Sequence, residues 1–382
     1  GGVRGPGARW KDRGDTAARD AVADAMDADD ETVRMAAIKA MAVLGNAENA
    51  PALAQIAADT EGAPQAAARQ SLARLPDPDT DDVLANALAD AEPAVRVELI
   101  KALAARQVED AAITVLEMAR TEDAAVRLAA LEALEALAGR RHIDSVVNLL
   151  VQARTDDERA AAVDAVVAVA RQFEDLEERF QELLEAQQGQ GPAGIPARKA
   201  MLRAYGKLGD EKSLAMPALA TRDTAEEVRD EAVRVLASWP NPNAIPVLLE
   251  VAKTTDNEKY KILTLRGLIR LLGEPSERSV EETVALYAEA MDLATRPDEK
   301  RQVLAGLANT PTPKALERTA AALSNEELVN EAAVAALKLG EALVGDHPEA
   351  VAEAMRSVMD ASGDQETKNK AYALLKKVDP DA

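Results

Sequence analysis

The chain has 382 residues and a net charge of −22, with 45 Lys and Arg residues against 67 Asp and Glu residues. A surface this acidic repels nucleic acid and anionic lipid as a whole, so neither is an expected partner. The absence of cysteine excludes disulfides and thiolate metal sites. No run of 18 apolar residues occurs, so no membrane span is expected.

The first residues differ in composition from the rest of the chain. Residues 1–14 are rich in Gly and carry four basic residues against Asp12 alone, namely Arg4, Arg9, Lys11 and Arg13. We interpret this segment as a flexible linker or the end of an upstream segment, rather than as a basic recognition arm.

The next stretch, residues 30–45, reads DETVRMAAIKAMAVLG and predicts one amphipathic helix. Ile38, Met41 and Leu44 follow Arg34 by four, seven and ten positions, so they form one apolar stripe at about 100° per residue. Asp30 stands where an N-cap is expected, and Gly45 stands where a helix commonly ends.

This pattern recurs along the chain when Arg34 is taken as an anchor position. Seven positions after every anchor stands an apolar residue, and four positions after it stands another, with the single exception of Arg69. Spacings of 30 to 39 residues identify a repeat array. The eleven anchors are Arg34, Gln65, Arg96, Arg127, Arg159, Arg198, Arg229, Lys261, Lys300, Asn330 and Lys368.

A second, shorter helix fits between successive anchor helices, as at residues 51–58, 81–89, 111–119, 145–153 and 245–252. Each repeat is therefore predicted to be a helical hairpin. One hairpin cannot bury its apolar stripe alone, so neighbours must stack and share a core. The predicted fold is all-α, an α-solenoid of about eleven hairpins.

The repeat resembles HEAT repeats, in particular the short variety of the phycobilin-lyase type. The signature stands here as DDETVRMAAIKAMAVLG, DAEPAVRVELIKAL, TEDAAVRLAALEALEALAG and RDTAEEVRDEAVRVL. The resemblance covers about residues 15–378 and implies a right-handed superhelix. The repeats are rich in Ala, use Arg more than Lys, and include a late helix that begins HPEA. In these respects they also resemble arrays in large secreted or periplasmic proteins of environmental bacteria, so a periplasmic or secreted location is favoured over a cytoplasmic one.

Three repeats are longer than the others, and their added length begins at residue 171, so the later part of the chain is less regular. The added length falls at residues 171–197, 273–300 and 340–368, where longer first helices are expected. We therefore divide the chain into a linker at 1–14, regular repeats at 15–171, and repeats with three longer copies at 172–382.

Residues suited to catalysis or metal binding are sparse. The two histidines, His142 and His347, belong to non-adjacent repeats, so a histidine metal site is not expected and each is interpreted as a surface or capping residue. There is no phosphate-binding loop, no G-x-S-x-G and no cysteine nucleophile. We expect no catalytic residue, no cofactor and no metal. An enzymatic function is suggested only by analogy with the lyases that share this repeat.

A stripe of positive charge is the one candidate binding feature. Positions five and nine after an anchor point away from the apolar stripe. In the three middle repeats five of these six positions hold basic residues and only Ser238 is neutral; the basic residues are Arg203, Lys207, Arg234, Arg266 and Arg270. The HEAT resemblance implies that they face the concave side, where arginine suits carboxylates, phosphates or sulfated glycans. The alternative is that they pair with acidic residues on adjacent helices.

The sequence thus predicts a non-catalytic scaffold or adaptor that binds another, unidentified protein through an extended solenoid surface. Two alternatives stay open. One is an anion- or glycan-binding module that uses the basic stripe, and the other is an accessory, lyase-like domain of a larger enzyme. A structural role is also predicted for the anchors Arg34, Arg96, Arg127 and Arg229, which we expect to bond to the turn carboxylates Asp30, Asp90, Asp123 and Asp223.

Overall fold

A computed structural model describes residues 18–191 and 193–380 of the chain, and the elements in this part are all helical. The expected linker at residues 1–14 lies outside the described residues. The chain divides into two compact units, the first ending at Ala204 and the second beginning at Tyr205. None of the helices in the described ranges combines the length and the apolar character that crossing a membrane requires.

Each of the eleven anchors lies in its own helix, so the predicted repeat is confirmed. These anchor helices are α2 (Glu31–Leu44), α4 (Ala63–Arg74), α6 (Pro93–Ala105), α8 (Ala124–Leu137), α10 (Asp156–Ala170), α12 (Ile195–Leu208), α14 (Glu226–Ala237), α16 (Glu258–Leu272), α18 (Pro297–Leu307), α20 (Val329–Leu343) and α22 (Gln365–Val378). The intervening helices are α3 (Ala50–Asp59), α5 (Thr80–Ala87), α7 (Ala112–Met118), α9 (Ile143–Gln152), α11 (Leu176–Gly189), α13 (Ala215–Ala220), α15 (Ile245–Thr254), α17 (Val280–Leu293), α19 (Pro313–Ala321) and α21 (Pro348–Ala361).

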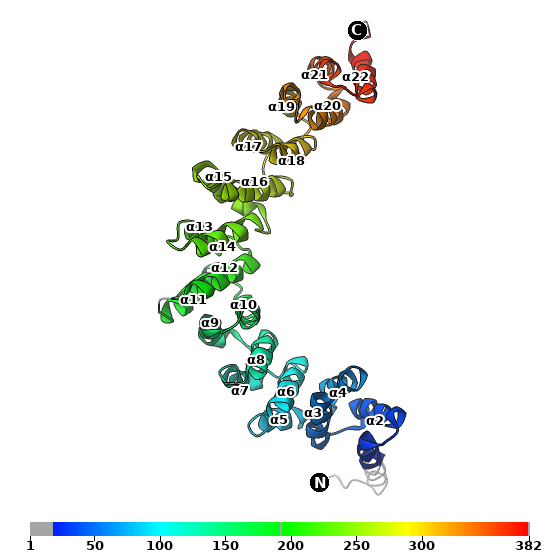
Figure 1. Ribbon diagram of the computed structural model, residues 1–382, viewed down its shortest axis with the longest axis vertical. Helices are drawn as coiled ribbons and strands as arrows, with labels where there is room; N and C mark the ends of the chain where they lie inside the picture. Colours follow the sequence, from blue (N-terminus) through cyan, green and yellow to red (C-terminus); the bar gives the residue numbers. More distant parts are fainter. Residues whose placement is uncertain (1–17, 192, 381–382) are drawn as a thin grey trace, which may run out of the picture. The chain divides into compact units, whose positions relative to one another are not determined.

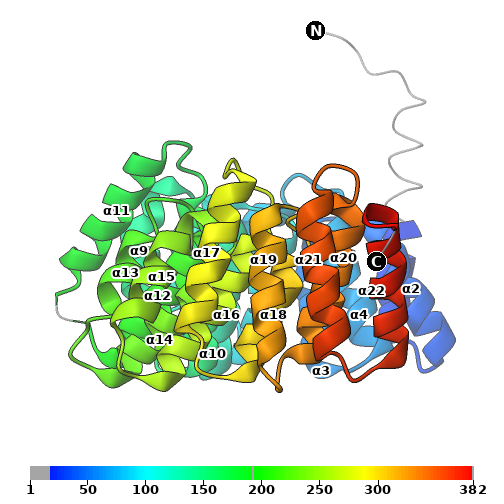
Figure 2. The same cartoon turned by 90° about the horizontal axis from the view of Figure 1, so that it is seen from above.

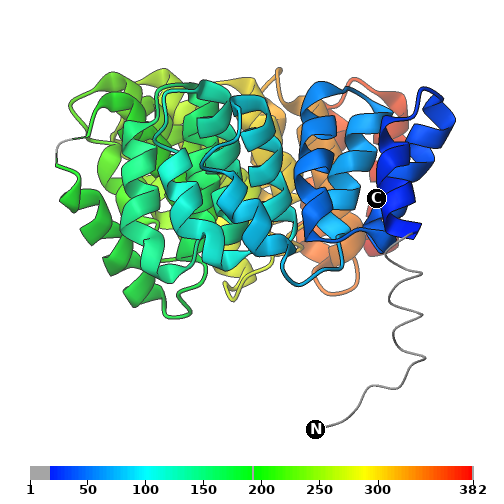
Figure 3. The same cartoon turned by 90° about the horizontal axis from the view of Figure 1, so that it is seen from below.

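Within each unit the helices form two layers. In the second unit the anchor helices α14, α16, α18 and α20 follow one another along one side, and α13, α15, α17 and α19 follow one another along the other (Figure 1). Figure 2 shows α17, α19 and α21 in one row, and Figure 3 shows the helices of the first unit, coloured blue to green, standing side by side. Anchor helices pack on the next anchor helix, as α6 does on α8 and α14 on α16. The chain is therefore an all-α solenoid of helical hairpins.

The three longer repeats owe their length to their intervening helices. These helices, α11, α17 and α21, have 14 residues each, whereas α7 has 7 and α13 has 6. This agrees with the expected longer first helices. The two compact units are divided after Ala204, whereas the boundary predicted after Arg171 separates regular from longer repeats. The first does not test the second, so the boundary after Arg171 stays a prediction.

Helix ends follow the local signals. The side chain of Asp30 accepts hydrogen bonds from the N–H groups of Thr32 and Val33, at 2.8 and 3.1 Å, and so caps α2. Asp123 caps α8 in the same way through Ala125 and Val126. Each carboxylate satisfies N–H groups that have no partner inside the helix.

The apolar stripe forms the core. Every residue seven positions after an anchor is buried, from Met41 to Leu375. The expectation for position four was wrong in the last two repeats, where Val334 and Tyr372 are 64% and 45% exposed. Position three is buried at Ala333 and Ala371, as it is in the other anchor helices, and position seven is buried as well, so the buried face of α20 and α22 is narrower on the side of position four.

Close contact between anchor helices requires small residues at particular positions. A Cβ atom added to Gly267 in α16 would lie 2.8 Å from both the Cα and the carbonyl oxygen of Ala237, at the end of α14. Backbone atoms cannot move aside as a flexible side chain can, so Gly267 sets the distance between α14 and α16. A Cβ on Gly45 would lie 2.6 Å from the carbonyl oxygen of Met41 in its own helix, so that glycine is required by the end of α2.

Gly267→Ala should therefore destabilise the second unit, because the added methyl group forces α16 away from α14. We expect a loss of about 1–3 kcal/mol, the usual cost of overpacking, measured as a lower midpoint of urea unfolding. Gly189→Ala is the matched control, because a Cβ there has no neighbour within 4 Å. Equal midpoints for the two variants would contradict the close-contact account.

Candidate functional site

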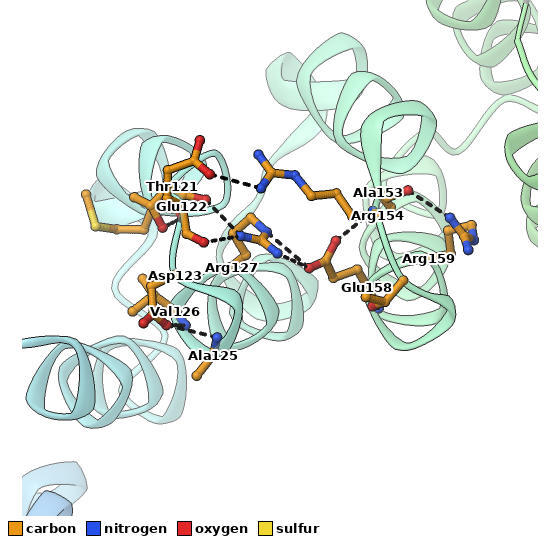
Figure 4. Close-up of polar contacts among 12 residues, drawn as sticks. Thr121, Glu122, Asp123, Ala125, Val126, Arg127, Ala153, Arg154, Glu158 and Arg159 are labelled. Carbon is orange, nitrogen blue, oxygen red and sulfur yellow. Dashed lines mark hydrogen bonds and ion pairs between the residues drawn. The ribbon is translucent and has the colours of Figure 1, made fainter.

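Arg127 connects three helices through one guanidinium group (Figure 4). Its Nη1 donates to the carbonyl oxygens of Thr121 and Glu122, at 3.1 and 2.7 Å, in the turn that follows α7. Its Nε and Nη2 donate to Oε1 of Glu158 in α10, at 3.0 and 2.8 Å. Both side chains are buried. The anchor arginine thus joins the end of an intervening helix to the next anchor helix.

Other anchor arginines make the same contact with the main chain. Arg34 Nη1 donates to the carbonyl of Ala28 at 2.6 Å, and Arg229 Nη1 donates to that of Asp223 at 2.7 Å, in each case six residues earlier. The predicted carboxylate partners Asp30 and Asp123 were wrong, since these side chains cap the anchor helices. The carbonyl groups at the end of a helix lack intrahelical partners, and the arginines supply the missing donors.

The carboxylate of Glu158 is held from two sides. Its Oε2 accepts a hydrogen bond of 2.7 Å from the N–H of Arg154 while Oε1 contacts Arg127. Burial acts to raise the pKa of Glu158, but the hydrogen bonds from Arg154 and Arg127 and the charge of Arg127 hold it below its ordinary value. The ionised pair is therefore part of the folded structure.

A second buried carboxylate explains the exception at Arg69. Arg69 donates from Nε and Nη2 to the two oxygens of Glu98 in α6, at 2.6 and 2.7 Å. Burial acts to raise the pKa of Glu98, yet Arg69 and Lys101 together keep it below its ordinary value. Sequence reasoning missed both Glu98 and Glu158. The break in the apolar pattern at Arg69 was the only available signal.

The five residues of the predicted basic stripe are all exposed, as expected from their positions. Arg203 belongs to the first unit, and Lys207, Arg234, Arg266 and Arg270 belong to the second. The last two are engaged within the protein. Arg266 forms an ion pair of 2.9 Å with the buried Glu299, and Arg270 donates to the carbonyl of Trp239 at 2.6 Å.

Acidic groups also lie near two other members of the stripe. The pKa of Asp156 is lowered mainly by the hydrogen bond from Arg159 and further by the charge of Arg203. The pKa of Asp230 is lowered chiefly by Lys259, with a smaller contribution from Arg234. Arg234 itself is exposed and makes no ion pair or hydrogen bond with the described residues through its side chain.

Both histidines have structural positions. His142 is buried, and its Nδ1 accepts a hydrogen bond of 2.9 Å from the N–H of Gly139, which is a capping contact as predicted. Burial and the charge of Arg141 lower the pKa of His142, so its neutral form is favoured. His347 directly precedes α21. Within residues 18–191 and 193–380, no three His, Asp or Glu side chains lie together as a metal site requires.

Two open grooves lie in the second unit. A groove of ≈ 780 Å³ between the α13–α14 and α15–α16 hairpins is lined by Arg222, Arg229, Glu250, Asp256 and Tyr260, among others. A groove of ≈ 1260 Å³ follows α17, α19 and the start of α21, and its rim carries five acidic residues together with Lys314, Arg318 and His347. A much smaller pocket of ≈ 100 Å³ surrounds Arg127 and Glu158 in the first unit.

Comparison with known proteins identifies the repeat. Residues 7–73 and 81–167 match the family described as HEAT repeats. No curated protein matches the chain in sequence. The subtype of the phycobilin lyases is not confirmed and stays a prediction.

Solved structures that align with most of the chain include Kap95p and Kap121p, of which Kap95p shows the same kind of fold. Kap95p, from a study of how its binding changes the switch loops of RanGDP, aligns with 94% of this chain and 56% of its own length, at 13% identity and a TM-score of 0.51. Kap121p bound to Pho4p aligns with 94% of this chain and 48% of its own, at 13% identity and a TM-score of 0.47. The present chain thus spans little more than half of Kap95p, and the likeness concerns the fold.

Arg127→Met should destabilise the first unit, because it leaves the Glu158 carboxylate buried without its partner. We expect a loss of about 3–5 kcal/mol at neutral pH, seen as a lower urea midpoint. The pKa of Glu158 is lowered in the folded protein, so the contribution of the pair is complete above 4.5 and is lost as the pH falls through the lower folded value. The difference between the two proteins should therefore shrink in acid.

Arg154→Met serves as the control. The Arg154 side chain pairs with Glu122, whose side chain is almost fully exposed, and such surface pairs contribute about 0–1 kcal/mol. A penalty for Arg127→Met no larger than that of the control, and unchanged between pH 7 and pH 3, would contradict the role assigned to the buried pair.

Proposed function

We propose, from the premise that this chain is a HEAT-repeat protein, that it is a non-catalytic scaffold that binds another protein through the surface of its stacked hairpins. The observation that carries this proposal is that the buried carboxylates form ion pairs between neighbouring repeats. Glu98, Glu158 and Glu299 each pair with an arginine of the preceding anchor helix. These groups hold neighbouring repeats together and do not converge on a reaction site.

Open surface between repeats also supports binding. The two grooves of the second unit are open, and each is lined by residues of two or three hairpins, as an extended partner requires. Kap95p, which has the same fold, is described as binding RanGDP. We extend to this chain only the general use of such a surface, which is contact with a protein.

The anion- or glycan-binding alternative rests on the exposed Arg234. Because Arg266 and Arg270 are engaged within the protein, Arg234 is the member of the stripe in α14 and α16 whose side chain makes no ion pair or hydrogen bond with the described residues. The lyase-like alternative has no comparable observation in its favour. The exclusion of nucleic acid rests on the net charge of −22 and stays part of the proposal.

Site-specific photo-crosslinking tests the scaffold proposal. The photoreactive residue p-benzoylphenylalanine should replace Leu219 in the second unit's intervening layer and Val334 in its anchor layer, since both side chains are well exposed. In cells of the source organism, we expect one discrete protein adduct from at least one position, because a scaffold holds its partner in a fixed register. Only diffuse background adducts from both positions would contradict the proposal.

Heparin added to lysed cells before irradiation distinguishes the anion-binding alternative. That alternative would be favoured if heparin removes the adduct of the parent protein and of Arg74→Glu but no longer affects the adduct of Arg234→Glu. Arg74 is exposed on α4 of the first unit and gives the same change in charge away from the stripe. The scaffold proposal predicts an adduct that heparin does not displace.

A further inference from the structure

The groove around Arg229 and the small pocket around Arg127 occupy the same position in their repeats. When Arg229 is placed on Arg127, all nine residues that line the small pocket have counterparts that line the larger groove. Arg120 corresponds to Arg222, and Leu131 corresponds to Val233. The residue just before the next anchor differs in chemistry, because Tyr260 stands in the groove where the carboxylate of Glu158 stands in the small pocket.

The small pocket shows which group this position can hold. The Glu158 carboxylate accepts hydrogen bonds from Nε and Nη2 of Arg127 and from the N–H of Arg154 (Figure 4). Three donors from two elements therefore surround one carboxylate. With this group in place, the remaining space is ≈ 100 Å³.

The larger groove contains the counterparts of these donors, on Arg229 and Asp256, but no carboxylate at the position of Glu158. Arg229 uses Nη1 for the carbonyls of Asp223 and Thr224, as Arg127 does in its own turn. Its Nε and Nη2 make no hydrogen bond of ordinary geometry with the described residues and receive no carboxylate from them, although the guanidinium lies near the Tyr260 hydroxyl. The N–H of Asp256, the counterpart of the Arg154 N–H, likewise has no acceptor in the part of the chain that the structure describes. The open space is ≈ 780 Å³.

Tyr260 adds a buried polar group to this groove. The residue is 6% exposed, and its hydroxyl group lies near Asp230 and Arg229 but makes no hydrogen bond of ordinary geometry with either. Burial raises the pKa of Tyr260, the nearby Asp230 raises it further, and Arg229 acts in the opposite direction, so the phenol stays protonated and can donate. A buried hydroxyl without a partner is costly, and an incoming acceptor would relieve that cost.

We propose that the groove receives the side-chain carboxylate of a glutamate from a partner protein. The carboxylate would contact Nε and Nη2 of Arg229 and the N–H of Asp256, in the place that Glu158 takes beside Arg127. Bidentate contact with arginine suits this group in both geometry and charge. The exposed Leu219 and the nearby Val247 provide apolar surface for the residues next to that glutamate.

The acidic surface limits what this groove can attract from a distance. The net charge of −22 and the nearby Glu250 and Asp256 disfavour strongly acidic segments. Arg222 partly compensates, since it pairs with Glu250 at 2.8 Å. The structure therefore fits a single glutamate within a largely neutral segment, held by short-range contacts. This inference rests on the proposed function, because it names one contact of the protein partner.

NMR of the full-length protein labelled with ¹⁵N-arginine tests the site directly. The probe is N-acetyl-glutamate N-methylamide, with N-acetyl-glutamine N-methylamide as the neutral control. We expect a saturable shift of the Arg229 Nε–Hε signal with the carboxylate probe only, with a dissociation constant in about the millimolar range. The Arg127 signal is an internal control and should not respond, because Glu158 already occupies its donors.

Two variants make the result decisive. Tyr260→Glu should shift the Arg229 signal without probe and weaken probe binding at least tenfold, because the new side chain reproduces Glu158. Because Arg229→Gln deletes the reporting signal itself, binding to this variant is read from Arg222 in the same groove, whose Nε–Hε signal should show no saturable response. A shift that grows linearly with probe, an equal response to the neutral probe, or a saturable response to inorganic phosphate but not to carboxylate would overturn the assignment. These outcomes concern the groove alone, so a partner bound elsewhere would leave the scaffold proposal intact.

Discussion

The apolar stripe of each anchor helix is too wide for its own hairpin to cover. Leu103, Leu134 and Leu268 are completely buried only because the next anchor helix lies against them. The core is therefore a row of interfaces between neighbours, and its stability depends on contacts between adjacent repeats. This arrangement explains the low aromatic content, since Ala and Gly at the contact positions let successive anchor helices lie close together.

The polar contacts follow the same neighbour-to-neighbour rule. An anchor arginine such as Arg127 satisfies the carbonyls at the end of its own intervening helix and then receives a carboxylate from the next repeat. Where Tyr260 stands in place of that carboxylate, a larger groove lies beside Arg229. The proposed glutamate site depends on this one difference at a repeated position, which the fold tolerates because each interface is formed separately.

Local periodicity predicted the repeats and their boundaries, since the spacing of apolar residues within a helix is a property of the segment alone. The exposure of Val334 and Tyr372 was not predictable in this way, because neighbouring hairpins decide how wide the buried face of a helix is. The carboxylate partners assigned to the arginines were wrong, because a sequence does not show which backbone carbonyls lack hydrogen-bond partners. The five basic residues are exposed as their positions predicted, but their role in binding stays a prediction, and the ion pair of Arg266 with Glu299 depends on the register between repeats.

Hydrogen exchange of the full-length Leu103→Ala protein tests the central claim most directly, which is that each repeat depends on its immediate neighbours. Leu103 is completely buried in α6, and its truncation should cost about 2–5 kcal/mol locally. The account predicts faster exchange in α6 and in the hairpins that contain α4 and α8, with the effect fading toward more distant repeats of both units. An equal loss of protection along the whole chain would contradict it.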